Sequence, residues 1–192
     1  LAKRIWEVVE KEFESGELFE KVSPITKELL RFWFCEPFIS QRQFNFHKGQ
    51  KQSILNIIYL HEVLKINNVL EIYEQVAPDL LLESDLFGAK ETRNSLKESR
   101  YDLPKYLVKM ATGTGKTWVM HALLIWQILN AKNEEEKSGR FTKNFLIVAP
   151  GLIVYDRLLD AYKGRLSENG DGRDFSTNDF VRNKDLFVPE NY

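Results

Sequence analysis

One run of residues carries the chemistry that the sequence makes most evident, Lys109-Met110-Ala111-Thr112-Gly113-Thr114-Gly115-Lys116-Thr117. Gly113 and Gly115 lack a Cβ atom, so the backbone can turn tightly and bring its N–H groups against phosphate oxygens. Lys116 is suited to reach the β- and γ-phosphates of a nucleotide, and Thr117 to place its hydroxyl on a magnesium ion. The run therefore predicts a phosphate-binding loop for a nucleotide and Mg²⁺.

The flanking residues predict the elements that position such a loop. Tyr106-Leu107-Val108 is short, apolar and partly β-branched, which is typical of the end of a buried strand. Residues 118–129 are apolar over a length that suits a buried helix. A helix N-terminus behind the loop also favours an anion. The alternative, a glycine turn with an exposed lysine, is disfavoured because strand, loop and helix follow in the order that the motif needs.

Met110 stands where the full phosphate-loop pattern has its first glycine. Met-Ala-Thr-Gly-Thr-Gly-Lys-Thr resembles the first nucleotide-binding motif (Walker A) of superfamily 2 helicases. It is most similar to the restriction subunits of type I and type III restriction–modification enzymes, in which methionine-alanine commonly opens the motif. The resemblance covers residues 44–165. It implies that 111–117 bind nucleotide, with Lys116 and Thr117 as catalytic residues and Thr117 on the metal.

This resemblance implies an α/β fold, a P-loop (RecA-like) lobe in which helices flank a parallel sheet. The N-terminal residues show helical patterns instead. Residues 2–14 place apolar side chains at helical spacing, and Ser23-Pro24 is a typical start for a second helix over 25–34. We therefore expect a small helical appendage over 1–43 and the first part of an ATP-binding motor lobe over 44–192. Residues 67–103 are expected to form an insertion.

Composition restricts the other functions. The chain has 192 residues, 43% of them hydrophobic, and a net charge of −1, so bulk charge gives no support to a nucleic-acid partner. A single cysteine, Cys35, excludes a disulfide framework and fits a cytoplasmic location. The three histidines are scattered, no metal-ligand cluster is evident, and no apolar run reaches membrane-spanning length.

Residues 32–46 are rich in aromatic side chains, which either stack on nucleic-acid bases or pack into the core; we favour the core. In superfamily 2 proteins a glutamine ahead of a helix contacts adenine, and Gln50, before a helix expected from Gln52, is the best match. An amide suits this role because it can both donate to and accept from the adenine edge. Phe44 or Phe46 is a candidate to stack on the adenine ring. The alternative is a solvated glutamine at a helix start.

A second strand-and-loop pattern lies downstream. Phe145-Leu146-Ile147-Val148 is typical of a strand buried in a parallel sheet, and a helix is expected over 154–162. Between them, Ala149-Pro150-Gly151 resembles the superfamily 2 motif that contacts the backbone of the tracking nucleic-acid strand. By this resemblance Pro150 and Gly151 touch DNA, with Arg157 as a phosphate contact. Short strands are also possible at 180–181 and 186–188.

The acidic pair that ATP hydrolysis requires is not evident downstream of Lys116. We therefore expect a piece of a longer protein that binds ATP but does not hydrolyse it alone. The leading hypothesis is a part of an ATP-dependent DNA translocase or helicase, the restriction endonuclease subunit that partners a modification (methyltransferase) subunit. Two alternatives stay open, a P-loop kinase or nucleotide-transferring enzyme and a nucleotide-binding module that never hydrolyses.

Overall fold

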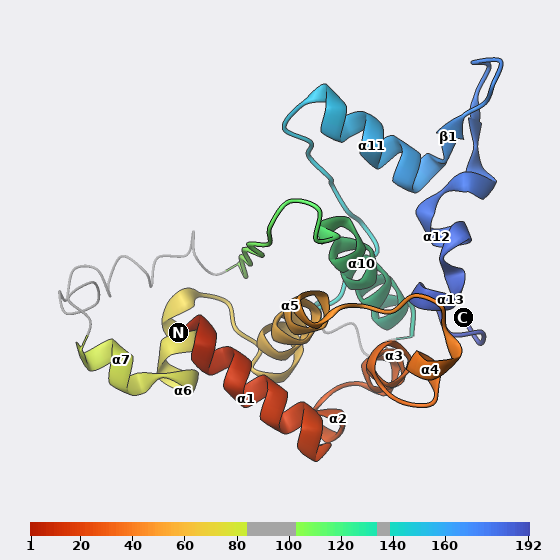
Figure 1. Ribbon diagram of the computed structural model, residues 1–192. Helices are drawn as coiled ribbons and strands as arrows, with labels where there is room; N and C mark the ends of the chain where they lie inside the picture. Colours follow the sequence, from red (N-terminus) through yellow and green to blue (C-terminus); the bar gives the residue numbers. More distant parts are fainter. Residues whose placement is uncertain (84–102, 134–138) are drawn as a thin grey trace. The chain divides into compact units, whose positions relative to one another are not determined.

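The computed structural model describes residues 1–83, 103–133 and 139–192. The chain forms two compact units, the first from residues 1–27 and 47–119 and the second from residues 28–46 and 120–192. Figure 1 follows the elements along the sequence. No helix in the described ranges combines the length and the apolar character that crossing a membrane would require.

The first unit is helical among its described residues. Its elements are α1 (Ala2–Ser15), α2 (Leu18–Lys21), the start of α3 (Pro24–Phe34), α5 (Lys48–Ile58), the π-helix η1 (Tyr59–Val63), α6 (Val69–Val76), α7 (Pro78–Glu83) and the first turn of α10 (Lys116–Asn133).

Local signals set the ends of these helices. α1 buries Ile5, Val9 and Phe13 on one face and ends at Gly16, whose φ of 83° is left-handed. The hydroxyl of Ser23 accepts the Thr26 N–H at 3.0 Å, which caps α3. Both helices confirm the sequence prediction. Of the expected insertion, residues 67–83 contribute α6 and α7, and residues 84–102 lie outside the described ranges.

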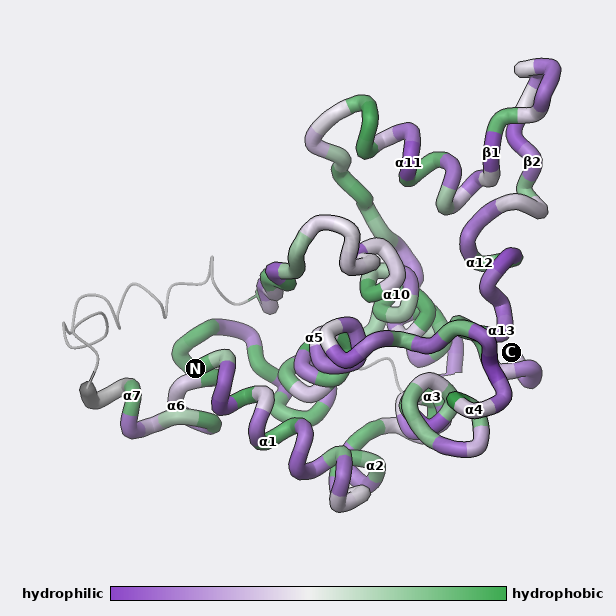
Figure 2. The backbone as a smooth tube through the Cα atoms, viewed as in Figure 1, coloured by the Kyte–Doolittle hydropathy of each residue, from purple (hydrophilic) through white to green (hydrophobic). Residues whose placement is uncertain are grey.

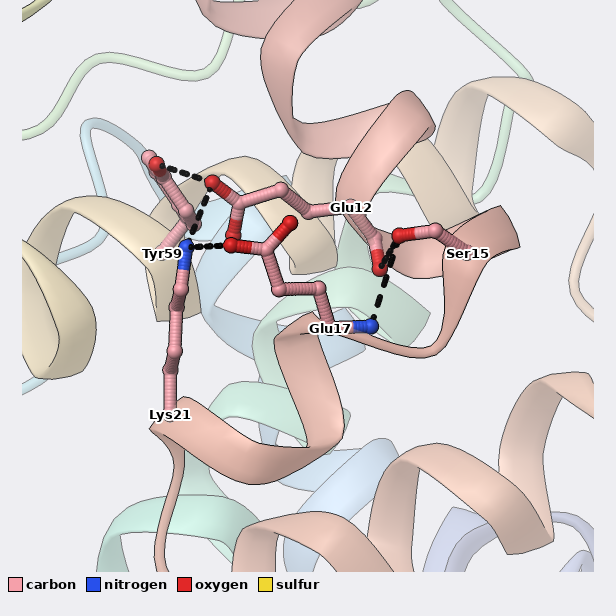
Figure 3. A network of polar contacts seen from close by, with 5 residues as sticks. All are labelled: Glu12, Ser15, Glu17, Lys21 and Tyr59. Carbon is pink, nitrogen blue, oxygen red and sulfur yellow. Dashed lines mark hydrogen bonds and ion pairs between the residues drawn. The ribbon is translucent and has the colours of Figure 1, made fainter.

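A polar network ties α1, α2 and η1 together within this unit (Figure 3). The ammonium of Lys21 lies 2.9 Å from a carboxylate oxygen of Glu12 and 2.7 Å from one of Glu17. The hydroxyl of Tyr59 donates to the same Glu12 oxygen at 3.0 Å. Burial, followed by the hydrogen bond to Glu12, raises the pKa of Tyr59 to about 12. The network joins α1, which packs against α5, to η1, the direct continuation of α5.

The strand expected at residues 106–108 is not formed. Residues 103–110 alternate between exposed and half-buried, which is the period of an extended chain, but they join no ladder in the described structure. Leu107 is 93% exposed. The pattern favours extended backbone, whereas a strand also needs a neighbour for its N–H and C=O groups. Within this segment the Tyr106 hydroxyl lies 3.2 Å from His61 Nδ1.

The second unit contains the rest of α3 and α10 with α4 (Phe38–Gln41), α11 (Leu152–Lys163), the strands β1 (Arg165–Leu166) and β2 (Arg173–Asp174), the 3₁₀-helix η3 (Phe175–Thr177), α12 (Asp179–Arg182) and α13 (Lys184–Phe187). Aromatic rings form its core. Trp33 and Phe34 each lie edge-on to Phe46, which also contacts Phe187. The indole N–H of Trp33 donates to the Phe187 carbonyl at 3.0 Å. The prediction that residues 32–46 serve the core is confirmed for these three aromatics.

A histidine is buried without a polar partner in the same unit. His121, on α10, is fully buried, and neither ring nitrogen has a hydrogen-bond partner. Its ring lies among those of Tyr162, Phe180 and Phe187, with centroids 5.2, 4.6 and 5.5 Å away. Burial lowers the pKa of His121 to about 4 from its usual 6.5, since the charged form would lose its hydration.

The parallel sheet predicted from the sequence is not present among the described residues. The sheet found there is an antiparallel pair, with Arg165 opposite Asp174 and Leu166 opposite Arg173. Residues 145–148 form no strand, and Leu146 is 89% exposed. Figure 2 shows the chain leading into α11 in the green of hydrophobic residues. The pattern lacks the neighbouring strands that would turn it into a sheet.

The short strands expected at 180–181 and 186–188 are also wrong, because these residues belong mainly to α12 and α13. The side chain of Asn178 accepts the Val181 N–H at 2.8 Å and caps α12. A cap of this kind starts a helical turn even where aromatic and β-branched residues favour a strand.

Candidate nucleotide-binding site

The glycine loop adopts the backbone that its sequence predicts. Gly113 and Gly115 have φ values of 80° and 70°, in the left-handed region where side chains are unfavourable. Thr114 closes the turn, since its hydroxyl donates to the Ala111 carbonyl at 2.7 Å and its N–H to the same oxygen at 3.4 Å. The loop is thus a tight turn that leads directly into α10.

The start of α10 presents unpaired donors. The helix begins at Lys116, and the Trp118 N–H donates to the Gly115 carbonyl at 3.0 Å. The backbone N–H groups of Gly115, Lys116 and Thr117 have no hydrogen-bond acceptor among the described residues. Such groups at a helix N-terminus suit an anion, both as donors and through the helix dipole.

The side chain of Lys116 lies over the loop. Its ammonium donates to the carbonyl oxygens of Met110 and Ala111, at 2.9 Å each. The residue is exposed, so the ammonium can also reach a ligand above the loop. Thr117 follows at the second position of α10, half-buried, and Thr112 is exposed within the loop.

Gln50 lies against this loop. Its side-chain Nε2 donates to the Gly115 carbonyl at 3.2 Å, and its Oε1 accepts the His47 N–H at 3.0 Å. Gln50 is 4% exposed, so it is not the solvated glutamine of the alternative interpretation. A Cβ atom on residue 115 would lie 2.3 Å from Gln50 Nε2. Glycine is therefore required at 115 by its φ and by the approach of this amide.

The helix around Gln50 begins earlier than predicted. α5 starts at Lys48, not near Gln52, so Gln50 lies in the first turn. The cause is His47, whose Nδ1 accepts the N–H groups of Gly49 at 3.1 Å and Gln50 at 3.4 Å. With Gln50 Oε1 on the His47 N–H, the two residues form a reciprocal capping box.

His47 is the site residue that sequence reasoning missed. Its Nε2 lies 2.9 Å from the carbonyl oxygen of Thr114, 67 residues further along the chain. Histidine is not among the residues preferred at a helix N-cap, so a search for Ser, Thr, Asp or Asn passes over it. The available signal was the glutamine three residues later, which is the second half of a capping box.

The residues predicted to touch DNA belong to the second unit. Gly151 is the N-cap of α11 with extended backbone, and its carbonyl accepts the Tyr155 N–H at 2.9 Å. Pro150 and Gly151 are exposed. Arg157 is exposed on α11 and has no hydrogen bond or ion pair with any described residue.

The adenine-stacking candidates differ in access. Phe46 is 9% exposed and its ring contacts three other aromatic rings, so it belongs to a core. Phe44 is 60% exposed. Within residues 1–83, 103–133 and 139–192, no group of three or more His, Cys, Asp or Glu side chains could hold a metal ion.

Comparison with known proteins gives one match. The family model for the type III restriction enzyme res subunit matches residues 43–188. No curated protein and no solved structure matches the chain.

Proposed function

Because the chain belongs to the family of type III restriction enzyme res subunits, we propose that it is the ATP-binding part of an ATP-dependent DNA translocase that serves restriction. The family supports a helicase-like, ATP-dependent restriction subunit. The observation that carries the finer proposal is the set of unpaired N–H groups at 115–117, where α10 begins behind a loop with two left-handed glycines.

We assign the nucleotide phosphates to residues 111–117. The backbone N–H groups of Gly115, Lys116 and Thr117 and the ammonium of Lys116 would hold the phosphate oxygens. The hydroxyl of Thr117 would be one oxygen ligand of Mg²⁺, a cation that in such sites offsets phosphate charge. The fit rests on the three backbone N–H groups, which have no partner among the described residues, and on a loop whose curvature is already set.

Gln50 is proposed to link the adenine to this loop. One hydrogen of its Nε2 and one lone pair of its Oε1 are used within the protein. The second hydrogen and the second lone pair are the groups that would recognise the adenine edge.

The DNA contacts are proposed for Pro150, Gly151 and Arg157, at the start of α11. An exposed guanidinium that has no ion pair with the described residues suits a phosphate of the DNA backbone. By the same family assignment, a modification subunit is the proposed protein partner.

The test of nucleotide binding is the variant Lys116→Ala, measured by calorimetry with ADP. A charge-assisted hydrogen bond contributes about 1.5–3 kcal/mol, so the affinity should fall roughly tenfold to a hundredfold. Lys109→Ala is the matched control, because it removes an equal charge from an exposed lysine next to the same loop. Equal ADP affinity of wild type and Lys116→Ala, with both folded, would overturn the proposal.

A further inference from the structure

The tautomer of His47 follows from its hydrogen bonds. Nδ1 accepts the N–H groups of Gly49 and Gln50, so it carries no proton. The proton of the neutral ring is then on Nε2, which lies 2.9 Å from the Thr114 carbonyl oxygen. The ring therefore accepts at the helix α5 and donates to the phosphate loop at the same time.

That donation fixes a peptide group of the loop. In a trans peptide the C=O of one residue and the N–H of the next point in opposite directions. Holding the Thr114 oxygen toward His47 therefore turns the Gly115 N–H away from α5. This N–H is one of the three donors that the proposed function assigns to the phosphates, and it has no protein partner among the described residues.

The next peptide is supported differently. The Gly115 oxygen accepts from the Trp118 and Val119 N–H groups at 3.0 and 3.4 Å, as well as from Gln50 Nε2. The first turn of α10 thus holds the 115–116 peptide even without α5. Among the described residues, His47 is the donor found for the Thr114 oxygen.

We propose that His47 is a positioning residue for the nucleotide phosphates, acting through the Thr114 carbonyl to aim the Gly115 N–H at a phosphate oxygen. The inference rests on the proposed function and adds a residue outside the glycine loop to its phosphate site. The competing explanation is that His47 only caps α5.

Two substitutions divide the two roles of the ring. Asn places an acceptor at the δ1 position, where it can cap α5, but has no atom at ε2 to reach Thr114. Gln has an Nε2 donor but lacks an acceptor at δ1. Positioning predicts that His47→Asn, which keeps the α5 cap, loses less Tm than His47→Gln, while its ADP affinity falls about threefold to tenfold, the effect of one hydrogen bond. It also predicts that His47→Gln lowers the Tm but stays closer to wild type in ADP affinity.

Inorganic pyrophosphate is the second probe, since it carries phosphates without a base. Its affinity should fall in His47→Asn by the same factor as that of ADP. The inference is overturned if His47→Asn binds ADP like wild type, if ADP affinity simply follows the Tm in both variants, or if pyrophosphate affinity is unchanged. Wild type that fails to bind ADP, or binds it no better than Lys116→Ala, would instead overturn the proposed function itself.

Discussion

The side-chain amide of Gln50 occupies the space that a side chain on Gly115 would need. Gln50 Nε2 lies 3.2 Å from the Gly115 oxygen, and a Cβ on residue 115 would come within 2.3 Å of the same nitrogen. Two segments 65 residues apart therefore meet with no room for a methyl group between them. The glycine serves this contact as well as the turn.

Gly115→Ala should be more harmful than Gly113→Ala. Both residues have positive φ, which costs about 1–2 kcal/mol for a residue with a side chain. Only at 115 does the added methyl displace Gln50, whose two hydrogen bonds contribute about 0.5–1.5 kcal/mol each. Urea unfolding of both variants measures the difference. In a Gln50→Ala background the two glycine substitutions should cost the same, and a difference that persists there would contradict the explanation.

The free energy of unfolding should fall as the pH drops below 6.5, the ordinary pKa of a histidine. The pKa of buried His121 is about 4, against 6.5 in the unfolded chain, so between these values only the unfolded chain binds the proton. The free energy of unfolding is unaffected by His121 well above pH 6.5 and falls as the pH drops from 6.5 toward 4. The loss reaches at most about 3 kcal/mol, at 1.36 kcal/mol per pKa unit. Unfolding at pH 7 and pH 5 measures it.

His121→Phe is the variant that isolates this effect. It keeps a ring among Tyr162, Phe180 and Phe187 and removes two buried nitrogens that have no partner. The variant should lose less stability than wild type between pH 7 and pH 5. An identical pH dependence of both proteins would show that His121 is hydrated or paired in solution.

Two tryptophans should respond differently to the same substitution. Trp33→Phe leaves the Phe187 carbonyl without its 3.0 Å donor inside a buried aromatic core, which costs about 1–3 kcal/mol. Trp6→Phe removes an indole N–H that is buried without a partner, so it should cost less. Thermal unfolding of the two variants tests this, and equal losses would contradict the assigned role of the Trp33–Phe187 hydrogen bond.

Arg157→Ala should weaken DNA binding. Each phosphate that a protein neutralises on duplex DNA contributes about −0.9 to the slope of log affinity against log salt. The variant should bind more weakly and show a slope shallower by that amount. Lys163→Ala, at the other end of α11, removes an equal exposed charge and serves as the control. Equal effects of both substitutions would place the contact elsewhere.

Local signals gave the correct helices, whereas long-range pairing could not be predicted from the sequence. The left-handed Gly16, the hydroxyl of Ser23 and the glycine loop act on neighbouring residues, so their effects follow from the sequence alone. Residues 145–148 have a strand pattern, but a ladder depends on a second segment that the pattern does not specify.

In the candidate site, too, the local loop could be predicted from the sequence but the long-range contact could not. Spacing identified residues 111–117 as a loop, and Gln50 was chosen by resemblance. The contact of His47 with Thr114 joins residues 67 apart and depends on how α5 packs beside the loop. No local pattern indicates a contact between segments so far apart in the sequence. Because His47 is an unusual N-cap, the start of α5 at Lys48 was also missed, four residues before the predicted start.

The ammonium of Lys116, held by the carbonyls of Met110 and Ala111, makes nucleotide binding an exchange rather than a simple addition. These two bonds use two of the three N–H donors of the ammonium, so a ligand that takes more than one hydrogen bond from Lys116 must replace a neutral oxygen. A monoanion such as chloride offers little advantage over that pair, whereas a polyphosphate brings several charges to one place. The loop is thereby biased toward polyphosphates over monovalent anions before any base is recognised.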